Sequence, residues 1–175
     1  MLEEYNFATQ IRQANAQGNR PDLIDIGSGS GFYLIELAQI LQKQGLLANC
    51  RLYGIDNNIE ALEEGERQLD SQGLAGQPVN FYYHNVLQPL ASCPDLAFEN
   101  ATESDFISIM RVLPYLPQAQ QVFKQIYAAL KPGGIICLAD FTFHSSKETG
   151  WVAPSPMESL FDKFNLLVTG INNGT

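Results

Sequence analysis

The chain has 175 residues, of which 45% are hydrophobic and 17% are charged. This length and composition predict one globular domain with a buried core, and they exclude wholesale disorder. Ten Lys and Arg against nineteen Asp and Glu give a net charge of −9. That balance, without any basic cluster, disfavours nucleic acid as a partner, because proteins bind nucleic-acid phosphates through a patch of basic residues.

Membrane, secretion and metal signals are missing from the sequence. No apolar run approaches the roughly 18 residues of a membrane span, and the acidic start Met1–Glu4 is the opposite of a secretory signal. Cys50, Cys93 and Cys137 are too scattered for a disulfide framework or a CxxC metal site. We therefore expect a reduced, cytoplasmic protein with no metal and no membrane partner, and the sequence does not indicate an oligomeric state.

Helical and strand patterns alternate along the chain. Helical spacing predicts helices over residues 2–16, 31–44, 58–72 and 118–130. Short apolar runs predict strands over residues 23–26, 51–55, 79–83, 106–110 and 134–139. Such an alternation predicts an α/β domain with a doubly wound, mostly parallel sheet covered on both faces. In these sheets the ligand lies beyond the carboxyl ends of the strands.

A glycine-rich turn follows the first predicted strand. Alternate glycines let the backbone turn tightly and approach a ligand, and the next helix presents free N–H groups there. The dinucleotide fingerprint G-x-G-x-x-G fails, because Phe32 stands at its last position. An acid ahead of alternating glycines suits a cofactor that carries an amino acid, and a plain strand-to-helix turn is the alternative. The candidate binding residues here are Asp25, Gly27, Ser28, Gly29 and Gly31.

Asp56 and Asn57 follow the second predicted strand. A carboxylate at this point can accept hydrogen bonds from both hydroxyls of a ribose. The alternative is that Asp56 or Asn57 caps the helix that follows. Because the glycine-rich turn precedes it in the chain, the ribose-binding role of Asp56 is favoured over the helix cap.

From Asp22 to Asp140 the chain resembles the class I S-adenosylmethionine-dependent methyltransferases, a Rossmann-like family. The glycine turn resembles the first motif of that family, and Asp56 resembles its ribose-binding acid. Residues 130–134, Leu-Lys-Pro-Gly-Gly, resemble its turn into the fifth strand. The resemblance implies S-adenosylmethionine as the cofactor.

The resemblance also implies roles for residues after the third and fourth strands. Asn85 would reach the adenine amino group, and the Val86 amide would lie near an adenine ring nitrogen. Met110 and Arg111 would line the floor of the cofactor site. One departure is Pro114, where the family often places a histidine.

A second departure concerns the end of the chain. The family fold usually closes with an antiparallel strand pair, whereas the residues after Asp140 predict one helix, Ser155–Lys163, and one strand, Asn165–Thr169. Either the sheet is reduced or these 175 residues are the front portion of a longer chain, and the second interpretation is favoured.

The implied reaction is methyl transfer, with a small molecule favoured as the acceptor. No fixed catalytic residue is required, so none is predicted. His144 and Tyr115 are candidate acceptor-site residues; His144 suits general-base work, with a solvated loop histidine as the alternative. Two other functions remain open: a non-catalytic cofactor-binding regulatory module, and an enzyme that modifies tRNA or uses an altered cofactor.

Overall fold

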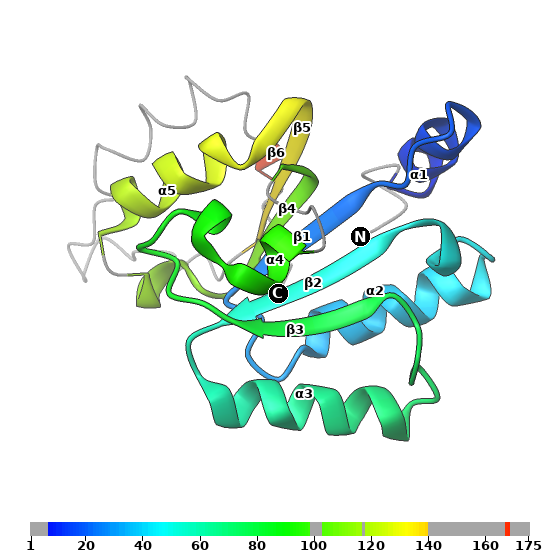
Figure 1. Ribbon diagram of the computed structural model, residues 1–175, viewed down its shortest axis with the longest axis horizontal. Helices are drawn as coiled ribbons and strands as arrows, with labels where there is room; N and C mark the ends of the chain where they lie inside the picture. The colour runs from blue at the N-terminus through cyan, green and yellow to red at the C-terminus, as the bar shows by residue number, and fades with distance from the viewer. Residues whose placement is uncertain (1–6, 99–102, 117, 140–166, 169–175) are drawn as a thin grey trace, which may run out of the picture.

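The structure is a computed structural model that describes residues 7–98, 103–116, 118–139 and 167–168 (Figure 1). Within these residues, one sheet has the strand order β3-β2-β1-β4-β5-β6, and every neighbouring pair is parallel. The chain order reverses between β1 and β4, which places the switch point there. The predicted doubly wound parallel sheet is confirmed. The strands are β1 (Asp22–Ile26), β2 (Arg51–Asp56), β3 (Val79–Tyr83), β4 (Ser104–Met110), β5 (Leu130–Ala139) and β6 (Leu167–Val168).

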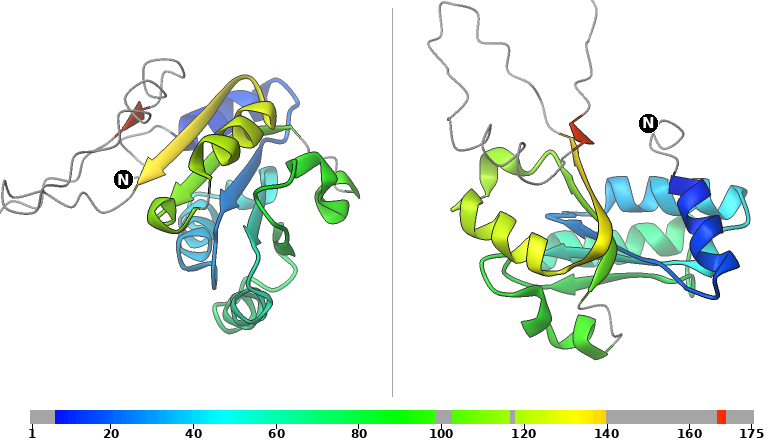
Figure 2. Two further views of the ribbon diagram at one scale, coloured as in Figure 1. Left: turned by 90° about the vertical axis from the view of Figure 1, so that its left-hand side faces the viewer. Right: turned by 90° about the horizontal axis from the view of Figure 1, so that it is seen from above.

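Helices cover both faces of the sheet (Figures 1 and 2). α2 and α3 lie on one face, whereas α4 and α5 pack against the other. Three short 3₁₀ turns and α4 were not predicted, because segments of three to five residues give no periodic pattern. The helices are α1 (Phe7–Ala16), α2 (Phe32–Lys43), α3 (Ile59–Ser71), α4 (Pro94–Phe98) and α5 (Ala119–Ala128), and the 3₁₀ turns are η1 (Leu47–Asn49), η2 (Leu90–Ser92) and η3 (Leu113–Tyr115).

The central strand β1 is buried on both of its faces. In β1, Leu23 packs into the core on the side of α2 and α3, while Ile24 and Ile26 pack on the side of α5. Successive side chains of a strand point to opposite faces, so a sheet with helices on both sides buries every residue of β1. The short run of Leu23, Ile24 and Ile26, interrupted only by Asp25, is the consequence.

Phe81 of β3 lies in a slot formed by three glycines. A Cβ atom at Gly31, which precedes α2, or at Gly54 of β2 would overlap the Phe81 ring, and one at Gly65 of α3 would lie 3.0 Å from it. Gly31 also has a φ of 72°, in the left-handed region that favours glycine. The ring therefore fixes where α2 begins relative to β2 and α3.

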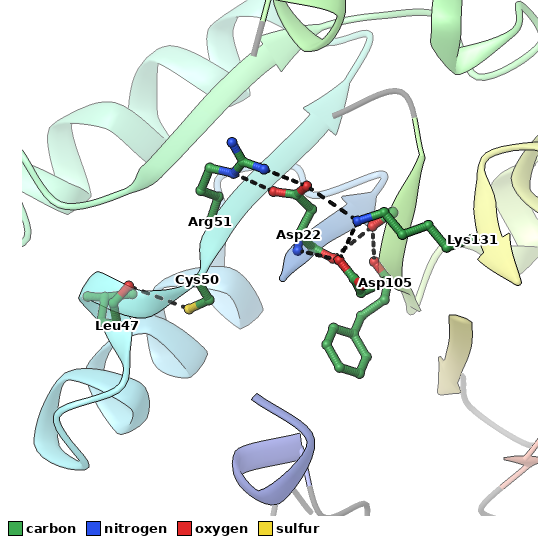
Figure 3. A network of polar contacts seen from close by, with 8 residues as sticks. Asp22, Leu47, Cys50, Arg51, Asp105 and Lys131 are labelled. Carbon is green, nitrogen blue, oxygen red and sulfur yellow. Dashed lines mark hydrogen bonds and ion pairs between the residues drawn. The ribbon is translucent and has the colours of Figure 1, made fainter. Parts of the chain in front are cut away.

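An ionic network ties the strands together at the amino edge of the sheet (Figure 3). Arg51 of β2 pairs with Asp22 of β1 at 2.5 Å, and Lys131 of β5 pairs with Asp105 of β4 at 2.9 Å. The Asp105 carboxylate also accepts the Asp22 backbone N–H at 2.9 Å. Burial raises the pKa of Asp22, and the charges of Arg51 and Lys131 offset part of that effect. This network lies opposite the carboxyl ends of the strands and serves stability.

One prediction about the last strands needs correction. β5 begins at Leu130 rather than Gly134: Leu130 pairs with Ser104 and Ile135 with Phe106, so the intervening residues form a bulge inside one strand. β6 pairs with β5 in parallel, and no antiparallel pair occurs within the described ranges. The predicted helix 155–163, most of the predicted strand 165–169 and residues 2–6 of the predicted first helix lie outside the described residues.

Candidate cofactor site

The glycine loop between β1 and α2 is held by β2. The Gly27 N–H donates to the Ile55 carbonyl at 2.8 Å, and the Gly31 N–H donates to the Ser28 carbonyl at 2.8 Å. Gly27, Gly29 and Gly31 all have positive φ values, of 70°, 53° and 72°. Three left-handed residues at alternate positions explain why the sequence places glycine at each.

Asp56, at the end of β2, holds both the loop and the start of α3. One carboxylate oxygen accepts the Gly29 N–H at 2.8 Å, and the other accepts the Asn58 N–H at 2.9 Å. The cap of α3 is Asn58, whose side chain accepts the Ala61 N–H at 3.1 Å. The alternative that Asp56 or Asn57 caps this helix is therefore wrong. Since a carboxylate has about four lone-pair positions, each Asp56 oxygen keeps one for a ligand.

A cavity of about 320 Å³ opens at the carboxyl ends of β1 to β4. It brings together seven residues that the sequence predicted for the cofactor or the acceptor. These are Gly27, Asp56, Asn57, Asn85, Val86, Arg111 and Tyr115. His84, Val112 and Leu116 also line the cavity and were not predicted to bind a ligand.

The wall after β3 is built from an ordered turn. The Asn85 side-chain oxygen accepts the Leu87 N–H at 3.0 Å, and the Asn85 carbonyl accepts the Gln88 N–H at 2.8 Å. His84 is buried; its N–H donates to the Asp56 carbonyl at 3.0 Å, and its Nε2 lies 3.3 Å from the Gln88 carbonyl. These bonds fix the amide of Asn85 beside the carboxylate that ends β2. His84 thus holds the turn in place and lines the cavity as well.

The wall after β4 lies across the cavity from that turn. Arg111 has a left-handed φ of 60°, and its N–H donates to the Ala139 carbonyl at 2.8 Å. Val112 covers the glycine loop, since a Cβ at Gly27 would lie 2.6 Å from its Cγ1. Tyr115, in η3, is 81% exposed. Met110, expected beside Arg111 in the cofactor floor, packs instead against the core on the side of α2.

Asp25 lies behind the glycine loop rather than in the cavity wall. It is 2% exposed, and its Oδ1 accepts the Ser108 hydroxyl at 2.6 Å. Burial raises its pKa to about 7; the Ser108 hydrogen bond opposes this change and the charge of Asp56 adds to it. Asp25 is therefore a buried support of the loop.

Three further predicted residues, Ser28, Gly29 and Gly31, shape the loop without lining the cavity. The Ser28 hydroxyl is buried without a hydrogen-bond partner among the described residues. His144 lies outside the residues that the structure describes. None of the described helices is long and apolar enough to cross a membrane, and the described side chains form no His, Cys, Asp or Glu group that could hold a metal ion.

The cavity suits a nucleoside-bearing ligand. Its volume falls within the roughly 300–1,000 Å³ of small-molecule sites. Asp56 offers two unused lone pairs to neighbouring hydroxyls, and the Asn85 amide offers donors to a base. Gly27 lines the cavity, and the space that a Cβ atom there would need is taken by the Val112 side chain. Together, a doubly wound sheet, a glycine loop after β1 and an acid after β2 define a Rossmann-like domain for a nucleoside cofactor.

Comparison with known proteins places the domain more closely. Residues 20–165 match the methyltransferase domain family, and the chain belongs to that family. The sequence-based identification as a class I S-adenosylmethionine-dependent methyltransferase domain, with S-adenosylmethionine as the cofactor, is confirmed.

Curated relatives are similar over most of this chain. A carboxy-S-adenosyl-L-methionine synthase of Desulfotalea psychrophila is 25% identical over 150 residues, covering 81% of this chain and 55% of the relative. A demethylmenaquinone methyltransferase of Geobacillus stearothermophilus is 29% identical over 129 residues, covering 73% and 48%. The chain thus spans about half the length of these relatives.

Solved structures support the fold. A S-adenosylmethionine-dependent methyltransferase from Aquifex aeolicus superposes with a TM-score of 0.56 at 18% identity, covering 79% of this chain and 63% of that protein. A sarcosine dimethylglycine methyltransferase from Galdieria sulphuraria gives a TM-score of 0.56 at 17% identity, covering 91% and 52%. At these identities the likeness concerns the fold alone.

Proposed function

We propose that this protein transfers the methyl group of S-adenosylmethionine to a small-molecule acceptor. The observation that carries the proposal is the cavity at the carboxyl ends of β1 to β4, which gathers Gly27, Asp56, Asn85 and Arg111 from four separate segments. Membership of the methyltransferase domain family supports the reaction class.

Different groups of the protein would bind different parts of the cofactor. Asp56 would accept the ribose hydroxyls, Asn85 and the Val86 amide would bind the adenine, and the glycine loop would hold the amino-acid part. Bound there, the cofactor supplies an electrophilic methyl group on a sulfonium. The protein's contribution is chiefly to hold the acceptor in line with that methyl group and to exclude water.

A small molecule is the favoured acceptor for two reasons. A curated relative is by name a demethylmenaquinone methyltransferase, and that name denotes a small-molecule substrate. The chain's net charge of −9 disfavours a polyanionic acceptor such as tRNA. We place this activity in the cytoplasm.

A second candidate is modification of the cofactor itself. It is favoured by 25% identity to a protein named carboxy-S-adenosyl-L-methionine synthase. Mass spectrometry of the nucleoside recovered after incubation with cell metabolites separates the two. Methyl transfer leaves S-adenosylhomocysteine, whereas the second candidate leaves a product heavier than S-adenosylmethionine.

Calorimetric titration with S-adenosylhomocysteine tests the cofactor site. Asp56→Ala should weaken binding about tenfold or more, because hydrogen bonds to a charged group are worth about 1.5–3 kcal/mol. The matched control is Asn58→Ala, which removes the cap of α3 outside the cavity. It should cost about 1 kcal/mol of stability and leave the affinity unchanged.

Two results would contradict this assignment. The whole proposal would be refuted if the wild-type protein showed no binding of S-adenosylhomocysteine at millimolar concentration. If Asp56→Ala left the affinity for S-adenosylhomocysteine unchanged, the assignment of Asp56 to the ribose would be refuted. Methyl transfer to a panel of small hydroxy, amino and thiol compounds then separates an enzyme from a non-catalytic regulatory module.

A further inference from the structure

Arg111 holds a backbone conformation that long side chains rarely adopt. Its φ is 60°, and among the described residues only Gln118 is another non-glycine with positive φ. Such conformations cost stability and persist where the surroundings enforce them; they gather at functional sites. Here the Arg111 N–H is anchored on the Ala139 carbonyl of β5, so β4 ends in a sharp reversal at this residue.

This reversal places Arg111 in the cavity wall next to η3. Tyr115 and Leu116 line the same wall, and Tyr115 is 81% exposed, so its ring is open to a bound molecule. Asp56 and Asn85 belong to the opposite, nucleoside-binding part of the lining. Arg111 is the only Lys or Arg among the lining residues that the structure describes.

The described lining offers little to a methyl acceptor that must lose a proton. Asp56 accepts two backbone N–H groups, and its remaining lone pairs are assigned to the ribose; His84 is buried with its Nε2 beside the Gln88 carbonyl. A guanidinium, however, favours the ionised form of a bound hydroxyl, and the released proton passes to water. A cation in the cavity lining can therefore do part of the work of a general base.

We propose, on the basis of the proposed function, that Arg111 and Tyr115 form the acceptor subsite. The acceptor class is an aromatic ring that bears an acidic hydroxyl. Its oxyanion pairs with the Arg111 guanidinium while its ring lies against Tyr115. Arg111 is then an acceptor residue rather than a cofactor residue.

The test uses 4-nitrophenol as the probe, because its phenolate absorbs visible light. With S-adenosylhomocysteine present and the buffer near the probe's own pKa, saturating wild-type protein should raise the ratio of phenolate to phenol about tenfold. Arg111→Gly should abolish that rise. It should also raise Tm by about 2–4 °C, because glycine adopts a φ of 60° without strain.

Gln118→Gly is the matched control. Gln118 has a φ of 51°, is exposed and lies outside the cavity lining. Its replacement should raise Tm in the same way and leave the phenolate ratio as in wild type. The methyl ether 4-nitroanisole, which has no proton to lose, should give no spectral change.

The inference is overturned by either of two results. One is wild-type protein that binds S-adenosylhomocysteine without changing the phenolate ratio. The other is an Arg111→Gly protein that keeps the ratio and loses affinity for S-adenosylhomocysteine, which would assign Arg111 to the cofactor. Failure of wild type to bind S-adenosylhomocysteine would instead refute the proposed function.

Discussion

Replacing Asp25 by Asn tests how the carboxylate behind the glycine loop affects stability. Asp25 is 2% exposed, and the Ser108 hydroxyl donates to its Oδ1 at 2.6 Å. Asparagine has almost the same shape and keeps an oxygen that accepts this hydrogen bond. The substitution therefore removes the titrating proton and little else.

The magnitude follows from the pKa of Asp25, which burial raises from 3.8 to about 7. Each pKa unit corresponds to about 1.36 kcal/mol, so the difference amounts to about 4 kcal/mol. Because the folded protein holds this proton more tightly than the unfolded chain, the contribution is fully present below pH 3.8. This contribution is lost progressively as the pH rises to about 7, and above that pH the effect of Asp25 on stability no longer changes with pH.

Urea unfolding of both proteins at pH 5.5 and pH 8.5 measures the effect. Between these values the free energy of unfolding of Asp25→Asn should rise relative to wild type by about 2 kcal/mol, since about 1.5 pKa units are crossed. The exposed Asp70 gives a control, Asp70→Asn, for the general loss of one negative charge. An Asp25→Asn difference that stays the same at both pH values would refute the reasoning.

Two more substitutions separate the carboxyl edge of the sheet from the amino edge. Gly31→Ala should cost about 1–3 kcal/mol of stability and weaken S-adenosylhomocysteine binding, because its Cβ overlaps the Phe81 ring. Gly29→Ala is the control and should cost less, because the space around Gly29 is open. Equal losses of stability in urea unfolding would contradict this account. Asp105→Asn breaks the ion pair with Lys131, which is 37% exposed, so it should cost at most about 1 kcal/mol. Calorimetry should show no loss of cofactor affinity for this variant, and a tenfold loss would mean that the two edges are coupled.

The fold could be predicted because its strands are buried on both faces. β1 is buried along its whole length, is apolar apart from Asp22 and Asp25, and is followed at once by a glycine-rich turn, so its position and its end are both visible in the sequence. Asp56 was found for a related reason, whereas Asn85 followed from the family resemblance. Asp56 is the last residue of β2 and Asn85 comes two residues after β3, and parallel strands bring such ends to one edge.

The wall after β4 could not be predicted in the same way. Val112 and Leu116 resemble ordinary core residues in the sequence, and only the left-handed turn at Arg111 brings their segment back to the cavity. That turn depends on a hydrogen bond to Ala139, which is distant in sequence. The bulge in β5 is similar, since Pro132 and the glycines after it are typical of a turn and pairing resumes at Ile135.

The Phe81 slot links the cofactor loop to β3. None of the residues of β3 lines the cavity. A Cβ atom at Gly31, Gly54 or Gly65 would press on the ring between them, and these glycines come from the start of α2, from β2 and from α3. A residue pattern within any one segment cannot reveal this, because the constraint exists only once the four segments are packed. It also implies that the position of the loop is set by core packing before any ligand binds. Affinity for the cofactor should then follow the integrity of this slot, whereas the choice of acceptor should depend on the separate wall that Arg111 begins.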